Sequence, residues 1–232
     1  ELTESIIFKK NNFFILIKPS KLKIPPIEFK NMIADFFPME NDMQLSNKKY
    51  SKKTREINFN NISIGGNSSN TLLITGPCSV ESIDQISKSA EFVKELNLTT
   101  LRAGCYKPRT SPYSFQGLGL EGLKMLSEIR KKHNLNIISE VRDASHVDEV
   151  IEHVDIIQIG AKAMYDHGIL RKCGKQNKPV FLKRGFGSNL KEFVQAAEFI
   201  LSGGNENVML CERGIRTFET YTRFTLDLCG VS

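Results

Sequence analysis

The stretch Leu72-Leu-Ile-Thr-Gly-Pro-Cys78 and the residues after it decide the fold. Apolar and β-branched residues that stop at a Gly-Pro pair are typical of a short buried strand. Ser82 and Gln85 then form a predicted capping box, and a helical face follows at Ile83, Ile86, Ala90 and Val93. The stretch therefore predicts one strand followed by one helix.

This strand–helix unit recurs along the rest of the chain. Five further strands are predicted at residues 99–102, 136–140, 156–159, 179–183 and 208–211. The helices between them are predicted at 120–132, after Asp143, up to about Lys172, after the cap Ser188, and at 218–228. Short buried strands that alternate with helices indicate a parallel sheet. The fold class is therefore α/β, with six βα units.

Two architectures suit six βα units, a TIM barrel and a doubly wound open sheet. The barrel is favoured because candidate functional residues follow every predicted strand, as expected where all strand ends converge on one mouth. A (β/α)8 barrel needs eight strands, so we expect a fragment, a truncated product, or a sheet that something else completes.

The N-terminal part has a different character. Residues 1–17 predict a hairpin, and residues 18–56 are irregular, with a basic run at 48–55. That run suggests either contact with a nucleic acid or partner, or a solvated linker, which is the favoured interpretation. Residues 57–64 predict a second hairpin. We expect an extension and linker at 1–56 and a partial barrel at 57–232.

Composition limits the class of substrate and the cellular compartment that we expect. The chain of 232 residues has a net charge of +6, which suits acidic small-molecule substrates and does not require nucleic acid. Its five cysteines include no C-x-x-C pair, which favours a reducing cytoplasm over a disulfide scaffold. No apolar run approaches the ~20 residues of a membrane span.

Cations gather after the predicted strands. Arg102, Lys107 and Arg109 lie within eight residues, in a frame stiffened by glycine and proline, and Lys183 and Arg213 follow later strands. Arginine and lysine bind phosphate and carboxylate oxygens through charge-assisted hydrogen bonds. The pattern predicts a mouth for a substrate with several negative charges. Some cations are expected to pair within the protein, with Glu212 or Glu140 holding Arg184 or Arg216.

Cys78 follows the first predicted strand. A thiolate there is a possible ligand for a soft or borderline divalent metal, although a lone cysteine at a strand end is more often a small buried hydrophobe.

Several motifs in order resemble those of the type I-beta 3-deoxy-D-arabino-heptulosonate 7-phosphate (DAHP) synthases, from about residue 71 to residue 232. They are Gly76-Pro-Cys-Ser-Val-Glu81, residues 101–119, Ile156-Ile-Gln-Ile-Gly-Ala161, Lys178-Pro-Val-Phe-Leu-Lys-Arg-Gly185 and Leu210-Cys-Glu-Arg-Gly-Ile-Arg-Thr-Phe-Glu219. The resemblance implies condensation of phosphoenolpyruvate with erythrose 4-phosphate, the first step of the shikimate pathway. The related KDO8P synthases share the Gly-Pro-Cys start, but residues 107–111 resemble the erythrose 4-phosphate version.

The resemblance also implies roles for individual residues. Phosphoenolpyruvate would be held by positions matching Arg102, Lys107, Lys183 and Arg213. Arg109 and Thr110 match positions that hold the sugar phosphate, with Lys107 near its reacting end as the catalytic candidate. The family has arginine where this chain has Lys162, so anion binding should be weaker there.

A divalent metal (Mn²⁺, Fe²⁺, Zn²⁺ or Co²⁺) is implied as cofactor, with Cys78 as one ligand. The other family ligands lie on later strands, so we expect this chain to bind substrate without catalysis. A homo-oligomer is expected at full length. The alternatives are a catalytically dead anion-binding remnant and a KDO8P synthase-like enzyme.

Overall fold

The computed structural model describes residues 6–10, 12–17, 24 and 27–231. Its centre is a parallel five-stranded sheet in the order β5-β6-β7-β8-β9, so neighbours in sequence are neighbours in space. The strands are β5 Thr100–Arg102, β6 Asn136–Val141, β7 Ile156–Ile159, β8 Val180–Lys183 and β9 Val208–Cys211. Each connection between them carries a helix, which confirms the predicted α/β alternation.

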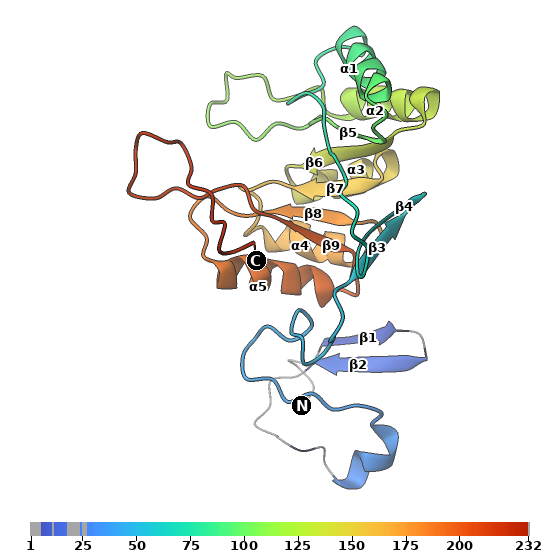
Figure 1. Ribbon diagram of the computed structural model, residues 1–232, viewed down its shortest axis with the longest axis vertical. Helices are drawn as coiled ribbons and strands as arrows, with labels where there is room; N and C mark the ends of the chain where they lie inside the picture. The colour runs from blue at the N-terminus through green and yellow to red at the C-terminus, as the bar shows by residue number, and fades with distance from the viewer. Residues whose placement is uncertain (1–5, 11, 18–23, 25–26, 232) are drawn as a thin grey trace.

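Helices line one face of this sheet (Figure 1). They are α1 Ile83–Glu95, α2 Leu120–His133, α3 Val147–His153, α4 His167–Gly174 and α5 Leu190–Leu201, with a 3-10 turn, η2, at Ala144–His146. Short polar side chains cap the amino-terminal ends of α1, α4 and α5. Ser82 accepts the Gln85 amide, and Asn189 forms a capping box with Glu192. The predicted cap Ser188 was wrong by one position.

Alternate residues of the strands face two separate apolar clusters, as the strand period of two requires. Ile137, Ile157 and Leu182 pack toward the helices in the main core. Ile138 and Ile156 face the other way, where the β3–β4 hairpin (Glu56–Phe59 and Ile62–Gly65) covers them with Ile57 and Phe59. This hairpin, predicted from the sequence, therefore closes the amino-terminal end of the inner face.

Two predicted elements are absent from the described residues. Residues 72–75 do not form a regular strand; Thr75 makes an isolated parallel bridge to Leu101 beside the edge strand β5. The predicted helix at 218–228 is an irregular loop instead, tied at its base by a bridge between Ile215 and Thr225. The five strands leave the barrel unclosed, with β9 at the other edge of the sheet.

The N-terminal part lies beside α5 and the start of β9 (Figure 1). Strands β1 Ile6–Lys10 and β2 Phe13–Ile17 form the predicted first hairpin, although Asn11 of its turn lies outside the described residues. A short 3-10 helix, η1, follows at Ile27–Met32, where no helix was predicted. Lys10 pairs with Glu206 at 2.6 Å, and Glu198 of α5 accepts the Ser46 amide at 2.8 Å.

No helix among the described residues is long and apolar enough to cross a membrane.

Candidate active site

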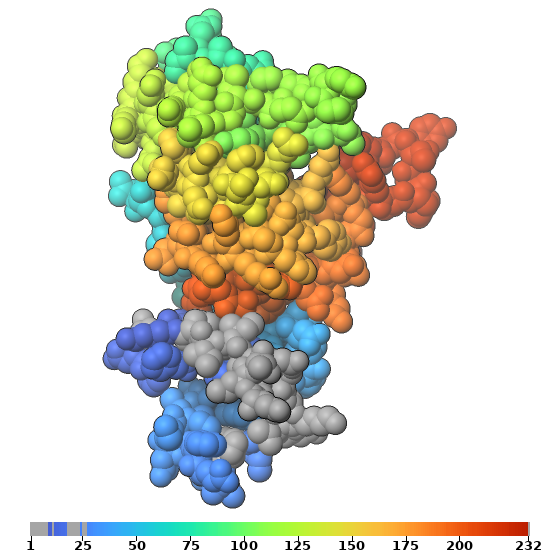
Figure 2. Space-filling model, turned by 180° about the vertical axis from the view of Figure 1, so that it is seen from behind, coloured from blue at the N-terminus to red at the C-terminus, as the bar shows by residue number. Residues whose placement is uncertain are grey.

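The carboxyl ends of the five strands share one edge of the sheet. The loops after β5 (green) and β9 (red) extend from this edge, on the opposite side from the β3–β4 hairpin (Figure 1). Viewed from behind, the red loop stands out from the body of the molecule (Figure 2). The predicted site residues lie at the ends of these strands or in the loops after them, except Cys78, which follows the bridged residue Thr75.

On the face of the sheet away from the helices, polar side chains follow the apolar ones toward the carboxyl ends of the strands. Glu140 lies two residues after Ile138 on β6, and Gln158 lies two residues after Ile156 on β7. Both side chains are buried. Arg102 reaches them from β5. Its Nε donates to Gln158 Oε1 at 3.0 Å, and its Nη2 lies 3.5 Å from Glu140 Oε2. Arg102 is therefore held in place by a buried polar pair.

Lys107 is the most buried of the predicted site cations, with 6% of its surface exposed. Its Nζ donates to the Cys78 carbonyl at 2.8 Å and lies 3.2 Å from Cys78 Sγ. The hydrogen bond from Lys107 to the Cys78 sulfur lowers the pKa of the thiol; burial opposes the shift, while Lys107, Arg102 and Arg109 add to it by their charges. Cys78 is exposed, so its thiol faces the mouth and is not the buried hydrophobe of the alternative interpretation.

The loop between Cys105 and Gly119 carries the remaining predicted residues. Backbone bonds pin its base: the Lys107 amide donates to Gln116 at 2.8 Å, and the Gly119 amide donates to Cys105 at 3.0 Å. Arg109 and Thr110 are exposed at the loop's outer part. Lys162, also exposed, joins the loop by donating to the Pro108 carbonyl at 3.2 Å.

Lys183 links the two ends of the cation cluster. Partial burial lowers the pKa of its ammonium, and repulsion from Arg102 and Arg213 lowers it further. Lys183 is therefore within electrostatic range of both arginines. The structure thus brings Cys78, Arg102, Lys107, Lys183 and Arg213 to one mouth.

Arg213 rests on two stacked phenylalanine rings. Its guanidinium carbon is 3.8 Å from the centroid of Phe224 and 4.9 Å from that of Phe186. Burial lowers its pKa, as do Arg223 and Arg216 nearby. Aromatic faces hold a guanidinium by cation–π attraction and leave its N–H groups available for other partners.

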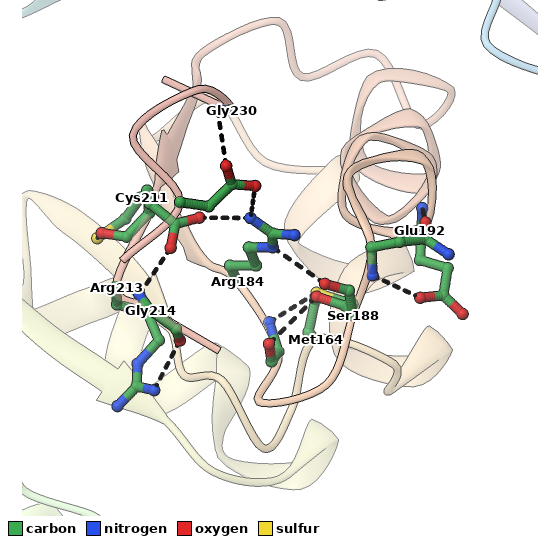
Figure 3. Close-up of polar contacts among 12 residues, drawn as sticks. Met164, Arg184, Ser188, Glu192, Cys211, Arg213, Gly214 and Gly230 are labelled. Atoms are coloured by element: carbon green, nitrogen blue, oxygen red, sulfur yellow. Dashed lines mark hydrogen bonds and ion pairs between the residues drawn. The ribbon is translucent and has the colours of Figure 1, made fainter. Parts of the chain in front are cut away.

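Some supporting residues were missed from the sequence. Gln158 interrupts an apolar strand, which was the available signal for it, and Asp227 lay in the wrongly predicted helix. Arg184 pairs with Glu212 at 2.8 Å, which confirms one of the predicted pairings. It also pairs with Asp227 at 2.8 Å (Figure 3). His167, the first residue of α4, stacks on Phe199 of α5, with 4.3 Å between ring centroids.

Comparison with known proteins identifies the family. The model of the DAHP synthetase I family matches residues 42–232. This chain belongs to that family.

Relatives of known function agree with this assignment. A phospho-2-dehydro-3-deoxyheptonate aldolase of Thermotoga maritima is 49% identical over 159 residues, which are 68% of this chain and 47% of that protein. A 2-dehydro-3-deoxyphosphooctonate aldolase of Francisella tularensis is 32% identical over 65% of this chain and 57% of that protein. Sequence identity thus favours the DAHP side of the family over the KDO8P-like alternative.

Solved structures of Thermotoga maritima DAHP synthase share the fold. One has a TM-score of 0.73 at 42% identity and covers 79% of this chain and 52% of that one. A truncated form of the enzyme has a TM-score of 0.71 at 41% identity, with 66% of its chain covered. The chain spans about half the length of the Thermotoga relative, and its sheet corresponds to part of a TIM barrel.

The metal implied by the resemblance does not fit the described residues. They contain no group of three or more His, Cys, Asp or Glu side chains that could hold a metal ion. Catalytic sites for such ions use about three protein ligands. Cys78 is the expected metal ligand that the described residues supply, and its sulfur already contacts Lys107.

Proposed function

We propose that this chain forms the phosphoenolpyruvate- and erythrose 4-phosphate-binding part of a 3-deoxy-7-phosphoheptulonate synthase. In that reaction the methylene carbon of phosphoenolpyruvate bonds to the aldehyde carbon of erythrose 4-phosphate, water adds to the enol carbon, and inorganic phosphate leaves. The observation that supports this best is that Arg102 and Lys107 converge on the Cys78 carbonyl, to which they donate at 3.4 Å and 2.8 Å. Two cations so close together, with Lys183 and Arg213 within electrostatic range of the cluster, suit a ligand that carries both a phosphate and a carboxylate.

Each side chain has a proposed role. Arg102, Lys183 and Arg213 would neutralise phosphoenolpyruvate, and Arg109 and Thr110 on the exposed loop would bind the phosphate of the sugar. Lys107 is the proposed catalytic residue, because a buried ammonium beside Cys78 can donate to the aldehyde oxygen as negative charge develops there. Lys162 would contribute a weaker contact than the arginine of relatives.

Calorimetric titration of the chain with phosphoenolpyruvate tests the binding role. We expect saturable binding that weakens about tenfold or more in Arg213→Met, because charged contacts contribute ~1.5–3 kcal/mol. Arg171→Met is the matched control, since Arg171 rests on the ring of Phe199 on the helical side of the fold. Absence of binding by the unsubstituted chain would show the proposal to be wrong.

The expectation of binding without catalysis needs a separate measurement. Phosphate release is followed from phosphoenolpyruvate and erythrose 4-phosphate with Mn²⁺ present. We expect none from these 232 residues, since the described part of the chain does not form a metal site. Release above background that is lost in Lys107→Met would overturn this expectation while supporting the proposed reaction.

We also propose the cytoplasm as location, in keeping with the free thiols of Cys78, Cys105, Cys173 and Cys211. We also propose that the protein forms a homo-oligomer, which sedimentation tests. A further proposal is the division of the chain at residue 56, which limited proteolysis tests. Nucleic acid is not an expected partner.

A further inference from the structure

Arg184 is a buried cation beside the proposed site that the proposed reaction does not use. Only 2% of its surface is exposed, directly after Lys183 at the end of β8. Its Nε donates to the Ser188 carbonyl at 3.0 Å. One nitrogen, Nη1, donates both to Glu212 Oε2 and to Asp227 Oδ2, each at 2.8 Å. A single guanidinium therefore holds two carboxylates.

The other oxygens of these two carboxylates are occupied as well. Glu212 Oε1 accepts the Gly214 amide at 2.6 Å, and Asp227 Oδ1 accepts the Gly230 amide at 3.0 Å. Burial works against the charged form of Arg184, but the hydrogen bonds with Asp227 and Glu212 outweigh it, so its pKa is raised. All three groups are charged at neutral pH.

Arg213 is the residue next to Glu212, yet the two side chains do not pair. Among the described residues no carboxylate oxygen lies within 4.0 Å of its guanidinium nitrogens. Its Nη1 donates to the Gly214 carbonyl at 3.0 Å, and its guanidinium extends away from Arg184 (Figure 3). Glu212 is nevertheless close enough to act on the charge of Arg213.

We propose that Arg184 is a positioning residue that holds the carboxylate of Glu212 away from Arg213. This keeps Arg213 available for an anionic substrate. Without Arg184, Glu212 would carry a buried and unpaired charge next to a cation, and pairing with Arg213 would be its most favourable arrangement. The inference rests on the proposed function, in which Arg213 contacts phosphoenolpyruvate.

The test is a set of binding measurements with phosphoenolpyruvate. Arg184→Met removes the charge at similar side-chain volume, and we expect the dissociation constant to rise about tenfold or more, the size of effect typical of coupled charged neighbours. The double variant Arg184→Met with Glu212→Gln should recover to within about threefold of the unsubstituted chain. The glutamine oxygen still accepts the Gly214 amide, so the turn keeps its shape while the competing charge is gone.

A purely structural role for Arg184 predicts a different pattern. Binding would then be equally weak in Arg184→Met and in the double variant, and that result would overturn the inference. Unchanged binding in Arg184→Met would overturn it too, whereas no binding by the unsubstituted chain would overturn the proposed function and this inference with it.

Two further variants keep the test decisive. Arg184→Lys retains the charge, so if Arg184→Met does not fold by circular dichroism, the lysine variant must still bind within about threefold of the unsubstituted chain. Weak binding by a folded Arg184→Lys that Glu212→Gln does not restore would also overturn the inference. Arg130→Met is the matched control, because it breaks an ion pair with the buried Asp155 (3.2 Å) at the other end of the sheet. It should leave binding unchanged.

Discussion

The pKa of Lys183 depends on several charged groups of the candidate site. Its pKa is lowered first by burial and then by Arg102 and Arg213, while Cys211 and Glu140 act in the opposite direction. A bound anion would stabilise the charged ammonium and so raise this pKa again. By linkage, the anion must bind more tightly to the chain in which Lys183 is protonated.

The affinity for phosphoenolpyruvate is therefore expected to fall on the alkaline side, with a midpoint below the ordinary lysine value of 10.5. Calorimetric titrations between about pH 7.5 and pH 10 measure it. They are made in a Cys78→Ser background, because the Cys78 thiol also has a lowered pKa. Lys183→Met should remove the inflection. Lys88→Met, on the exposed face of α1, should retain it, and an inflection that survives in Lys183→Met would contradict the assignment.

At the scale of elements, the loop from Cys105 to Gly119 depends on one glycine. Gly117 has a φ of +94°, and a Cβ there would lie 1.9 Å from the Cys105 carbonyl oxygen. That carbonyl accepts the Gly119 amide at the base of the loop. The backbone must therefore shift if any side chain is added.

We expect Gly117→Ala to destabilise the fold by about 2–4 kcal/mol and to weaken binding of phosphoenolpyruvate, because the loop carries Lys107. Urea unfolding and calorimetry measure the two effects. Gly187→Ala is the control, since a Cβ there would meet nothing within 4 Å and its effect should stay within about 0.5 kcal/mol. Equal effects of the two substitutions would contradict the argument.

The two hairpins look alike in sequence but differ in packing. Phe59 of β3 is 8% exposed against the inner face of the sheet, whereas Phe14 of β2 is 75% exposed. Phe59→Ala should therefore lower the free energy of unfolding by about 3–5 kcal/mol, and Phe14→Ala by less than about 0.5 kcal/mol. Chemical denaturation of both variants measures these changes in the free energy of unfolding. Similar losses would mean that the second hairpin does not close the sheet.

Elements with a strong local pattern were predictable, and those that depend on distant partners were not. Helix α1 follows from its apolar spacing and its cap at Ser82. The helix predicted at 218–228 is absent; Phe218 and Tyr221 are both 98% exposed, so no packing supports a helix there. Residues 72–75 have the composition of a strand but only a single bridge to hold them in one.

Across the whole molecule, the cations of the candidate site were predictable because they follow strands that end at one edge. Their partners were harder to find. The pairing of Arg102 with Gln158 spans 56 positions and that of Arg184 with Asp227 spans 43. Such contacts exist only once the sheet has brought its strands together. The sequence therefore predicts where charge gathers, but not which charges neutralise one another.

The Arg184 network also ties the C-terminal residues to the body of the molecule, because it joins β8, the end of β9 and Asp227. For Asp227, hydrogen bonding to Arg184 lowers the pKa below its ordinary value of 3.8. For Glu212, burial acts against the charged form, but bonds from Arg184 and Gly214 keep its pKa below 4.5. Both carboxyl groups thus bind protons more readily in the unfolded chain than in the native one.

Their contribution to stability is consequently complete above these ordinary values and is lost as the pH falls through the lower native ones. We expect the free energy of unfolding, measured by urea denaturation at successive pH values from about 7 to 3, to decline below about pH 4.5. Asp227→Asn should be less stable at neutral pH and should decline less steeply. Asp84→Asn, which removes an exposed i,i+4 pair with Lys88 on α1, is the control and should keep the original slope. An unaltered slope in Asp227→Asn would mean that Arg184 does not hold this carboxylate in solution.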